Sequence, residues 1–467
     1  MHSLRKWALP GALLVAAAAC NSDRLAIPNY NSPTVDGVAT DPNGIQLLVT
    51  GIQAGERGGY AGWVSDAGVF GRESYNYFPT DGRTVSNYLI GVLNPQRLER
   101  AGFASGRWTG PYQDMKNEVN LIAAANASTL ATDKKNGVIG FAKTMRAYDL
   151  YIIAASRDSL GGPTEIAADP SKPAPFVSRD SMYKAISGFL DEGKTALLGA
   201  GTSFSFQLHA GFAGFDTPAG FLKFNRALKA RVEVIRGSQG CGATCYNAAL
   251  TALGESFVTP VGAASSLAQL NVGPMHIYST ATGDAQNANS FAVRNYIFAH
   301  KSVITDAQKQ ADGVTLDDRV VRKVTALDVP VAPPGGINIA AEYRFLMYPT
   351  NSSPASIIRD EELILLRAEA NLATGNAASA LADLNNIRAV SGKLPPIAVA
   401  NLDALMYEKR MSTLFEGLRW VDMRRWGRLA QLPIDKAGQF VAKVMPIPQA
   451  ECDARLNASP NGCGANQ

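Results

Sequence analysis

The sequence predicts a mostly α-helical fold, built from packed pairs of helices with irregular, loop-rich excursions between them. Two observations favour it. Apolar side chains recur at spacings of three and four residues, and two stretches share one helix–glycine–helix pattern. Proline and glycine cluster at 159–175, 199–220 and 330–355, where we expect the excursions. Because 46% of the 467 residues are hydrophobic and 18% are charged, the chain can bury a sizeable core.

Four segments of the N-terminal half carry the helical pattern. The first covers 43–57, and two more follow at 112–125 and 138–155. A fourth opens at Asp180, whose carboxylate can accept hydrogen bonds from the free N–H groups of a first turn. The aromatic-rich region 60–108 interrupts this pattern, so we expect it to form loops carried on the helices.

Two later stretches resemble each other. Segment 230–237 precedes 246–253, and segment 368–375 precedes 378–384. Each has a helix with small residues, a glycine, and then a second alanine-rich helix. Small residues let antiparallel helices approach closely, and glycine adopts the left-handed conformation that ends a helix. This pattern is typical of tetratricopeptide-like helical hairpins, so we expect them to form a right-handed superhelical scaffold.

The N-terminus has the order of a secretory signal peptide. Arg5 and Lys6 precede an apolar run that ends at Ala19, which predicts that residues 1–19 are removed. The run is shorter than the roughly 20 apolar residues that span a bilayer, although a membrane anchor or a buried helix is the alternative. The segment 17–20, Ala-Ala-Ala-Cys, resembles a bacterial lipoprotein box, which implies that Cys20 is lipidated and becomes the mature N-terminus. We expect 20–42 to be a flexible tether and 43–467 a single domain.

Four cysteines remain after Cys20. An even number in an exported chain favours disulfides, and the spacing pairs Cys241 with Cys245 and Cys452 with Cys463. A metal site is the alternative, but the four histidines are scattered along the chain. We therefore expect neither a metal nor a cofactor.

The charge balance gives no reason to expect a nucleic-acid partner. The formal net charge is +4, and residues 1–19 contain two of the 44 basic residues and no acidic ones. The remainder holds 42 basic residues against 40 acidic ones, which is too small an excess for a basic patch to be inferred.

The C-terminal part contains a dense polar and aromatic motif, LFEGLRWVDMRRWG, at 414–427. The pairs Glu416/Arg419 and Asp422/Arg425 are three residues apart, so we expect each to form an ion pair along one helix face. A catalytic acid/base pair of Glu416 and Asp422, as in glycoside hydrolysis, is the alternative. A carboxylate beside an arginine stays ionised, however, whereas a general acid must be protonated. We therefore expect no catalytic residue, and a structural role for the following set: Glu416, Arg419, Trp420, Asp422, Arg424 and Trp426.

This motif resembles the hallmark of the SusD/RagB family. Segments 224–231, 359–388 and 446–451 also resemble family signatures and occur in the family order. The chain departs at Phe221, Leu418 and Val421, where Trp, His and Phe are frequent. The resemblance implies a lipoprotein anchored to the outer membrane of a Gram-negative bacterium and facing the exterior. It also implies that the protein binds a nutrient, typically an oligosaccharide, without cleaving it, and delivers it to a SusC-like TonB-dependent transporter.

Aromatic rings that stack on sugar faces are the feature to seek for such a ligand. The region 60–108 concentrates tyrosine and tryptophan among polar residues, which makes Trp63, Tyr75, Tyr77 and Tyr88 the ligand-binding candidates. The alternative is that these rings fill the core between the first helices. A second cluster, of Phe204, Phe206, Phe212 and Phe215, lacks polar atoms, and we interpret it as core or partner contact.

Two other functions remain open from the sequence. An exported glycan-active hydrolase would fit the compartment, but it needs two carboxylates in a cleft and no motif identifies them. A purely structural tetratricopeptide-like scaffold would explain the helical repeats but not the motif at 414–427.

Overall fold

The computed structural model describes residues 43–91, 98–102, 106–169, 171–335, 337–455 and 463. The expected signal peptide, the tether and Cys20 lie outside the described residues. Among the described residues there is no helix with the length and apolar character that a membrane crossing requires.

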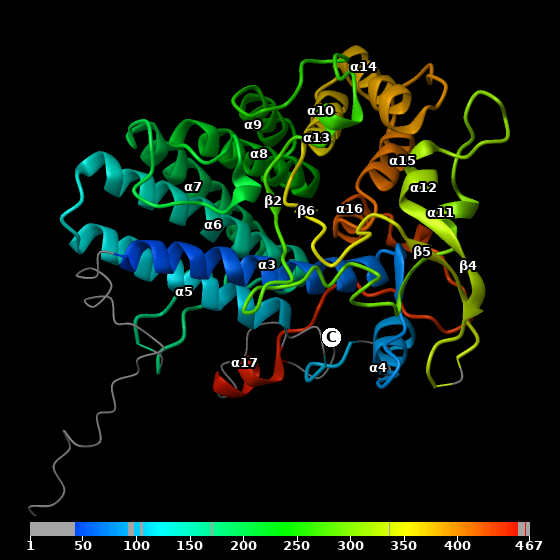
Figure 1. The fold of residues 1–467 in the computed structure, drawn as a ribbon, viewed down its shortest axis with the longest axis horizontal. Helices are drawn as coiled ribbons and strands as arrows, with labels where there is room; N and C mark the ends of the chain where they lie inside the picture. The colour runs from blue at the N-terminus through cyan, green and yellow to red at the C-terminus, as the bar shows by residue number, and fades with distance from the viewer. Residues whose placement is uncertain are drawn as a thin grey trace, which may run out of the picture.

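A continuous stack of helices forms most of the molecule (Figure 1). It begins with α3 (Gly44–Phe70), α5 (Gly106–Ala127), α6 (Thr132–Arg157), α7 (Arg179–Leu198), α8 (Pro218–Arg236) and α9 (Ala243–Gly254), each packed against the next. It continues through α13 (Asp360–Ala373), which packs on α9, and through α14 (Ala377–Ile387) and α15 (Leu402–Ser412). The predicted mostly helical fold is confirmed, and the two helical pairs expected from the repeats are α8/α9 and α13/α14.

The first helix is longer than the sequence predicted. It runs through Gly58 and Gly59 to Phe70, so residues 60–70 are helical and do not belong to a loop. Both glycines face open space, where they disturb no packing. Beyond them the helix enters the core, where nearly every residue from Tyr60 to Phe70 is buried.

The N-terminal cap of α7 also differs from the expectation. Ser178 is the capping residue, and its hydroxyl accepts a hydrogen bond from the Ser181 backbone N–H at 3.2 Å. Asp180 lies in the first turn instead, where its carboxylate forms an exposed ion pair with Lys184 at 2.9 Å. A carboxylate in this position still favours the helix, since it faces the positive end of the helix dipole.

A small antiparallel sheet lies at one end of α3 (Figure 1). Its strand order is β1 (Ser74–Asn76), β3 (Ile297–Ala299), β5 (Ala341–Phe345) and β4 (Val324–Val331), and β2 (Met275–His276) pairs separately with β6 (Ala355–Ser356). The sheet corrects one expectation, because β5 forms inside the proline- and glycine-rich region 330–355. The described residues of 161–177 and 199–217 are irregular apart from one isolated bridge and the short turn η5 (Ala210–Phe212).

Short helices complete the described chain. They are α4 (Arg83–Val85), η2 (Ser86–Ile90), η4 (Asp158–Leu160), η6 (Gly237–Cys241), α10 (Leu267–Leu270), α11 (Ser302–Thr305), α12 (Asp318–Lys323), η7 (Arg388–Gly392), α16 (Arg419–Arg425), η8 (Leu429–Gln431) and α17 (Gln449–Ala454). Disulfides join Cys241 to Cys245 next to η6 and Cys452 to Cys463 at α17, which is the pairing expected from the sequence.

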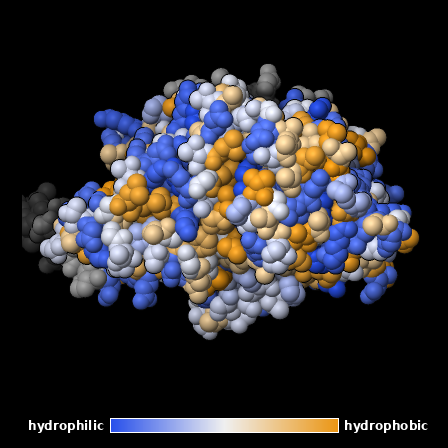
Figure 2. All heavy atoms as spheres, turned by 90° about the horizontal axis from the view of Figure 1, so that it is seen from above, coloured by the Kyte–Doolittle hydropathy of each residue, from blue (hydrophilic) through white to orange (hydrophobic). Residues whose placement is uncertain are grey.

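The core consists of one large hydrophobic cluster and one smaller one. The large cluster joins the helices α3 to α9 to the sheet, and the smaller one lies among α10, α13, α14 and α15. Phe206, Phe212 and Phe215 belong to the large cluster, and Phe204 packs against it. On the face seen in Figure 2 hydrophobic residues lie in several runs among hydrophilic ones.

Candidate functional site

The motif at 414–427 forms a sharp turn followed by helix α16. Phe415 (φ 57°) and Gly417 (φ 79°) both adopt left-handed backbone conformations, so the chain reverses before the helix begins. A Cβ on Gly417 would lie 2.5 Å from Nε1 of Trp63, and only glycine fits there. The Phe415 ring stacks on Phe345 with centroids 4.2 Å apart, which joins the motif to β5.

The expected pair of Glu416 and Arg419 does not form. The turn places Glu416 outside the helix, so the three-residue spacing rule does not apply to it. Its carboxylate binds Arg359 instead, at 2.9 Å. Arg419 donates to the carbonyl oxygen of Gly71 at 3.0 Å, and its burial lowers its pKa to about 9. Glu416 and Arg419 thereby hold the motif against two different parts of the chain.

The expected pair of Asp422 and Arg425 does form, at 2.8 Å, and Lys409 binds the same carboxylate at 3.0 Å. Burial raises the pKa of Asp422, but Lys409 and Arg425 outweigh it and hold that pKa below its ordinary value. Asp422 is therefore ionised at neutral pH and cannot serve as a general acid. Arg425 also forms a buried ion pair with Glu369.

The two tryptophans and Arg424 complete the motif's contacts. Trp420 is fully buried and donates from Nε1 to the Ala442 carbonyl oxygen at 2.7 Å. Trp426 donates to Glu369 at 3.1 Å. Arg424 donates to the Ala155 carbonyl oxygen of α6 at 2.5 Å. These contacts connect the last helices to the first ones, which fits the structural role expected for the motif.

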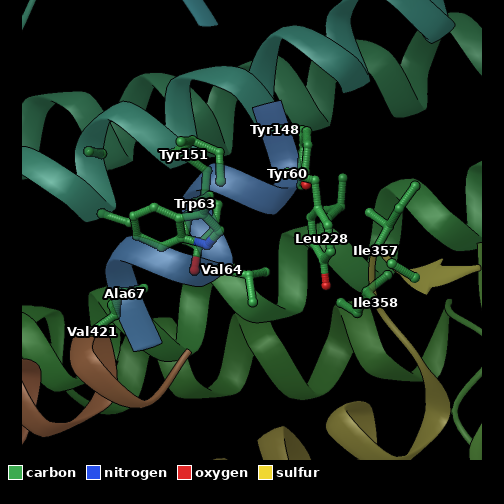
Figure 3. Close-up of a cluster of buried hydrophobic side chains, with 14 of the residues drawn as sticks. Tyr60, Trp63, Val64, Ala67, Tyr148, Tyr151, Leu228, Ile357, Ile358 and Val421 are labelled. Carbon is green, nitrogen blue, oxygen red and sulfur yellow. The ribbon is translucent and has the colours of Figure 1, made fainter. Parts of the chain in front are cut away.

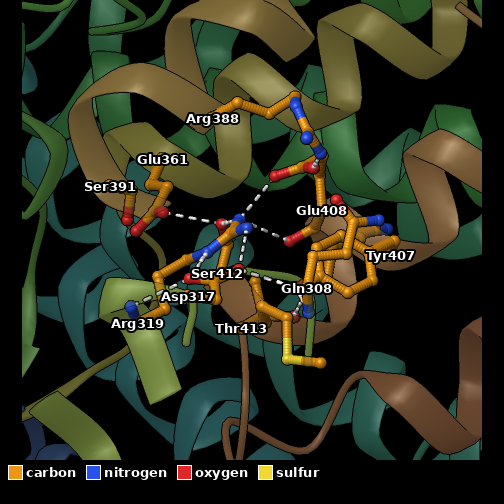
Figure 4. Close-up of polar contacts among 12 residues, drawn as sticks. Gln308, Asp317, Arg319, Glu361, Arg388, Ser391, Tyr407, Glu408, Ser412 and Thr413 are labelled. Carbon is orange, nitrogen blue, oxygen red and sulfur yellow. Dashed lines mark hydrogen bonds and ion pairs between the residues drawn. The ribbon is translucent and has the colours of Figure 1, made fainter. Parts of the chain in front are cut away.

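A second buried polar network lies between α12, α13 and α15 (Figure 4). Arg319 is at its centre, with Asp317 at 2.6 Å and Glu408 at 2.7 Å. Arg388 binds the other oxygen of Glu408 at 2.6 Å. Each of these charges is matched by a partner of opposite sign, so the network packs helices together and leaves no charged group free for a ligand.

The four aromatic candidates of the sequence are core residues. Trp63, Tyr75, Tyr77 and Tyr88 are each at most 3% exposed. Trp63 lies among apolar side chains of α3, α6 and α16 (Figure 3). Tyr75 donates its hydroxyl to Asp435 at 2.9 Å, and Tyr77 donates to the Ile339 carbonyl oxygen at 2.5 Å. From these positions the rings cannot stack on a sugar, so the structure gives them the alternative role in the core.

Partly exposed rings lie elsewhere, at residues that the sequence reasoning missed. Phe78 follows β1, and its ring meets that of Tyr296, which precedes β3, edge-on at 5.0 Å. Phe291 is also partly exposed, and the Arg344 guanidinium lies 5.2 Å from its ring centroid. We call Phe78, Phe291, Tyr296 and Arg344 the ring face. The signal in the sequence is FAVRNY at 291–296, where two rings flank an arginine and an asparagine within six residues.

A small cavity of about 40 Å³ lies between α3, α5 and α6. Glu56, Asp114 and Asp149 contribute to its lining. The group formed by Glu56, Asp149 and the neighbouring Glu118 has the spacing of metal ligands. Burial raises the pKa of all four carboxyl groups, that of Asp114 to about 7.

Comparisons with known proteins agree with this architecture. Residues 347–463 match the model of the SusD family. A SusD superfamily protein from Bacteroides vulgatus has a TM-score of 0.64 at 16% identity, covering 89% of this chain and 97% of its own. Surface glycan-binding protein A from Bacteroides uniformis has a TM-score of 0.64 at 15% identity, covering 88% and 97%. The same-named protein from Bacteroides thetaiotaomicron, solved with laminarihexaose, has a TM-score of 0.66 at 13% identity, covering 90% and 99%. No curated protein matches the chain.

Proposed function

This chain is a SusD/RagB-like protein, and from that premise we propose that it captures an oligosaccharide at the cell surface and delivers it to a TonB-dependent outer-membrane transporter. In this proposal Cys20 carries the lipid that anchors the protein to the outer membrane. The ring face is the part of the described surface that binds the glycan.

The observation that carries the proposal is the partly exposed ring pair of Phe78 and Tyr296 on a fold shared with glycan-binding proteins. The C–H faces of a sugar stack on aromatic rings, while its hydroxyl groups need polar partners nearby. The Arg344 guanidinium and the exposed side chain of Asn295 supply such partners beside the rings. Both rings border strands of the sheet, so a fixed backbone supports them.

Binding without hydrolysis fits the chemistry of the motif at 414–427 better than catalysis does. The two carboxylates that the hydrolase alternative would use, Glu416 and Asp422, are held in ion pairs with Arg359, Lys409 and Arg425. The purely structural scaffold remains the second alternative, and it predicts that no glycan binds.

The experiment is a calorimetric titration of the purified protein with a panel of oligosaccharides, with laminarihexaose as the first probe. Tyr296→Ala and Phe78→Ala should each weaken binding about tenfold, which corresponds to about 1.4 kcal/mol of lost stacking. Phe257→Ala is the matched control, because that ring is also partly exposed. Its centroid lies 4.9 Å from that of Phe215, and neither residue belongs to a strand of the sheet or to the ring face. The control should retain full affinity.

Two outcomes would contradict the proposal. If no oligosaccharide, polysaccharide or peptide in the panel binds, the scaffold alternative is favoured. If the two ring-face variants bind like the wild type, the ligand site lies elsewhere. Delivery is tested separately by purifying the full-length protein from its native membrane, where we expect a large β-barrel transporter to co-purify.

A further inference from the structure

Four carboxyl groups meet in the interior at the start of the helix stack. Glu56 comes from α3, Asp114 and Glu118 come from α5, and Asp149 comes from α6. All four are buried, and Glu118 is fully so. One oxygen from each of Glu56, Glu118 and Asp149 lies within 4.8 Å of the other two. The motif at 414–427 and the ring face use none of these residues.

These oxygens have no protein donor to neutralise them. Glu56 Oε1, Asp149 Oδ2 and both carboxylate oxygens of Glu118 are buried and accept no hydrogen bond from an N–H or hydroxyl group within the described part of the chain. Glu118 and Asp149 lie within hydrogen-bond reach of each other's carboxyl group. In the same part of the chain, no lysine or arginine forms an ion pair with any of the four groups. Unpaired buried carboxylates are strongly unfavourable, so something besides a protein cation must neutralise them.

The cavity beside the carboxyl groups gives the missing partner a place. Its lining includes Glu56, Asp114 and Asp149, and its volume of about 40 Å³ has room for about three water molecules. Gly55 lies against the carboxylate of Asp114, and a Cβ at this position would overlap the carboxylate oxygens. Glu56, whose Oε1 accepts no hydrogen bond within the described residues, lines this cavity, and the fully buried side chain of Glu118 extends to the same group of oxygens.

We propose that Glu56, Glu118 and Asp149, with Asp114 at the cavity, bind a divalent cation of the calcium type. Oxygen-only ligands select hard cations, and Ca²⁺ accepts six to eight oxygens at about 2.3–2.6 Å in flexible geometry. Two ligand oxygens of one such ion lie at most about 5 Å apart, and the three oxygens here satisfy this limit because they lie within 4.8 Å of one another. Waters in the cavity complete the coordination. The bound ion cross-links α3, α5 and α6, and it gives the first three helices of the stack a common ligand.

Shared protons are the competing way to neutralise the cluster. Burial raises the pKa of Glu56, Glu118 and Asp149 well above the ordinary value, which favours protonated carboxyl groups when no cation is present. Added metal distinguishes the protonated cluster from the cation-bound cluster, because only the cation-bound cluster forms in response to it.

The test uses the full chain after treatment with EDTA and exchange into metal-free buffer at neutral pH. Calorimetric titration with CaCl₂ should give one ion per chain, and the melting temperature should rise by several degrees and fall again with EDTA. Glu118→Gln and Asp149→Asn should each weaken Ca²⁺ binding at least tenfold. Glu192→Gln, which alters a half-exposed carboxylate on α7, should bind like the wild type.

A second readout uses the wild-type protein and therefore does not depend on whether a variant folds. Tb³⁺ bound at the site should luminesce when Trp63 and Tyr148 are excited, because both line the cavity, and Ca²⁺ should displace it. The proposal is overturned if the wild type binds neither Ca²⁺, Mg²⁺ nor Tb³⁺ at millimolar concentration, which indicates shared protons. It is also overturned if Glu118→Gln and Asp149→Asn bind the metal as tightly as the wild type. Glycan titration is an independent measurement, so the proposed function stands or falls separately.

Discussion

Arg359 connects three parts of the C-terminal region through one guanidinium group. It forms an ion pair with Glu361 at the start of α13, binds Glu416 at 2.9 Å and donates to the Ser412 carbonyl oxygen at 2.5 Å. Burial lowers the pKa of Arg359, but Glu416 and Glu361 outweigh it and raise that pKa above its ordinary value. The arginine therefore stays charged, and each carboxylate matters because it balances a charge that is hidden from water.

Glu416→Ala should destabilise the protein by about 3 kcal/mol, because it leaves the buried guanidinium of Arg359 with one carboxylate in place of two. Glu416→Gln should cost less, since the amide oxygen can still accept a hydrogen bond. Urea unfolding measures both free energies. A normal free energy of unfolding for Glu416→Ala, together with loss of a hydrolytic activity of the wild type, would instead make Glu416 a catalytic residue.

His276 predicts a sensitivity to acid. Burial, His209 and Arg57 together lower its pKa from 6.5 to about 3, and neither ring nitrogen has a hydrogen-bond partner among the described residues. The unfolded chain binds this proton near pH 6.5 and the folded chain does not. Stability from the neutral ring is therefore fully present above pH 6.5 and is lost as the pH falls toward 3.

Because of this linkage, the free energy of unfolding should be about 2 kcal/mol lower at pH 5 than above pH 6.5. His276→Phe removes the titrating group but keeps a ring beside Tyr60, whose centroid lies 5.1 Å from that of His276. The loss of stability between pH 7 and pH 5 should therefore be smaller in the variant, with the remaining share due in part to His209, whose pKa burial lowers to about 4. Thermal melts at both pH values measure this, and equal slopes for variant and wild type would contradict it.

At the scale of elements, close helix contacts depend on glycine at particular positions. On α7, a Cβ added to Gly193 would lie 2.9 Å from Asn225 Nδ2 of α8 and 3.0 Å from Thr144 Oγ1 of α6. Those two groups are hydrogen-bonded to each other at 2.8 Å. Gly193 thus lies where three helices meet, whereas Gly188 on the same helix has no neighbour within 4 Å of such a Cβ.

The two glycines form a matched pair for mutation. Gly193→Ala should destabilise the protein by about 1–2 kcal/mol, because the added methyl group overpacks the contact. Gly188→Ala should stabilise it by about 0.5–1 kcal/mol, since alanine favours the helix and meets no obstacle. Denaturant unfolding of both variants measures whether each substitution raises or lowers the free energy of unfolding. The same sign for both would show that helix propensity, and not packing, dominates.

Elements with a strong periodic pattern could be predicted from the sequence, and their contacts over long sequence distances could not. Helices α5, α6 and α7 lie where apolar spacing placed them, and α8 and α13 contain the first helices expected from the repeated helix–glycine–helix pattern. The end of α3 was misjudged because the aromatic-rich residues after 57 interrupt the apolar pattern, although the helix continues through Gly58 and Gly59 to Phe70. The partner of Glu416 was misjudged because Arg359 is 57 residues away, while Arg419 satisfied the local spacing rule. Trp63 and Tyr75 were assigned to a ligand because the sequence does not show which rings the sheet and helices cover.

At the scale of the whole molecule, the family motif and the fold support the proposed surface location, which depends on the N-terminus. Residues 347–463 carry the family match, and the solved structures extend the likeness to about nine-tenths of the chain. The proposed lipid at Cys20 would hold this assembly at the membrane through the segment 20–42.

We expect the mature protein to begin at an acylated Cys20 and to lack residues 1–19. Mass spectrometry of detergent-extracted protein should show an N-terminal peptide heavier by the mass of the acyl chains. Cys20→Ala should move the protein out of the membrane fraction without changing its glycan affinity. Recovery of a wild-type product that retains Met1 would exclude lipidation.

The contact between α3 and the C-terminal motif also sets the order in which the protein can fold. The chain is synthesised from its N-terminus, so α3 emerges long before the residues that cover it. Arg419 reaches the Gly71 carbonyl oxygen across 348 residues, and Arg72 reaches that of Phe440 across 368 residues. Until the last part of the chain is made, the apolar face around Trp63 and Phe70 lacks the Trp420 ring that covers it. The nascent protein is therefore expected to depend on a chaperone that shields this first helix, and to complete its core only after synthesis ends.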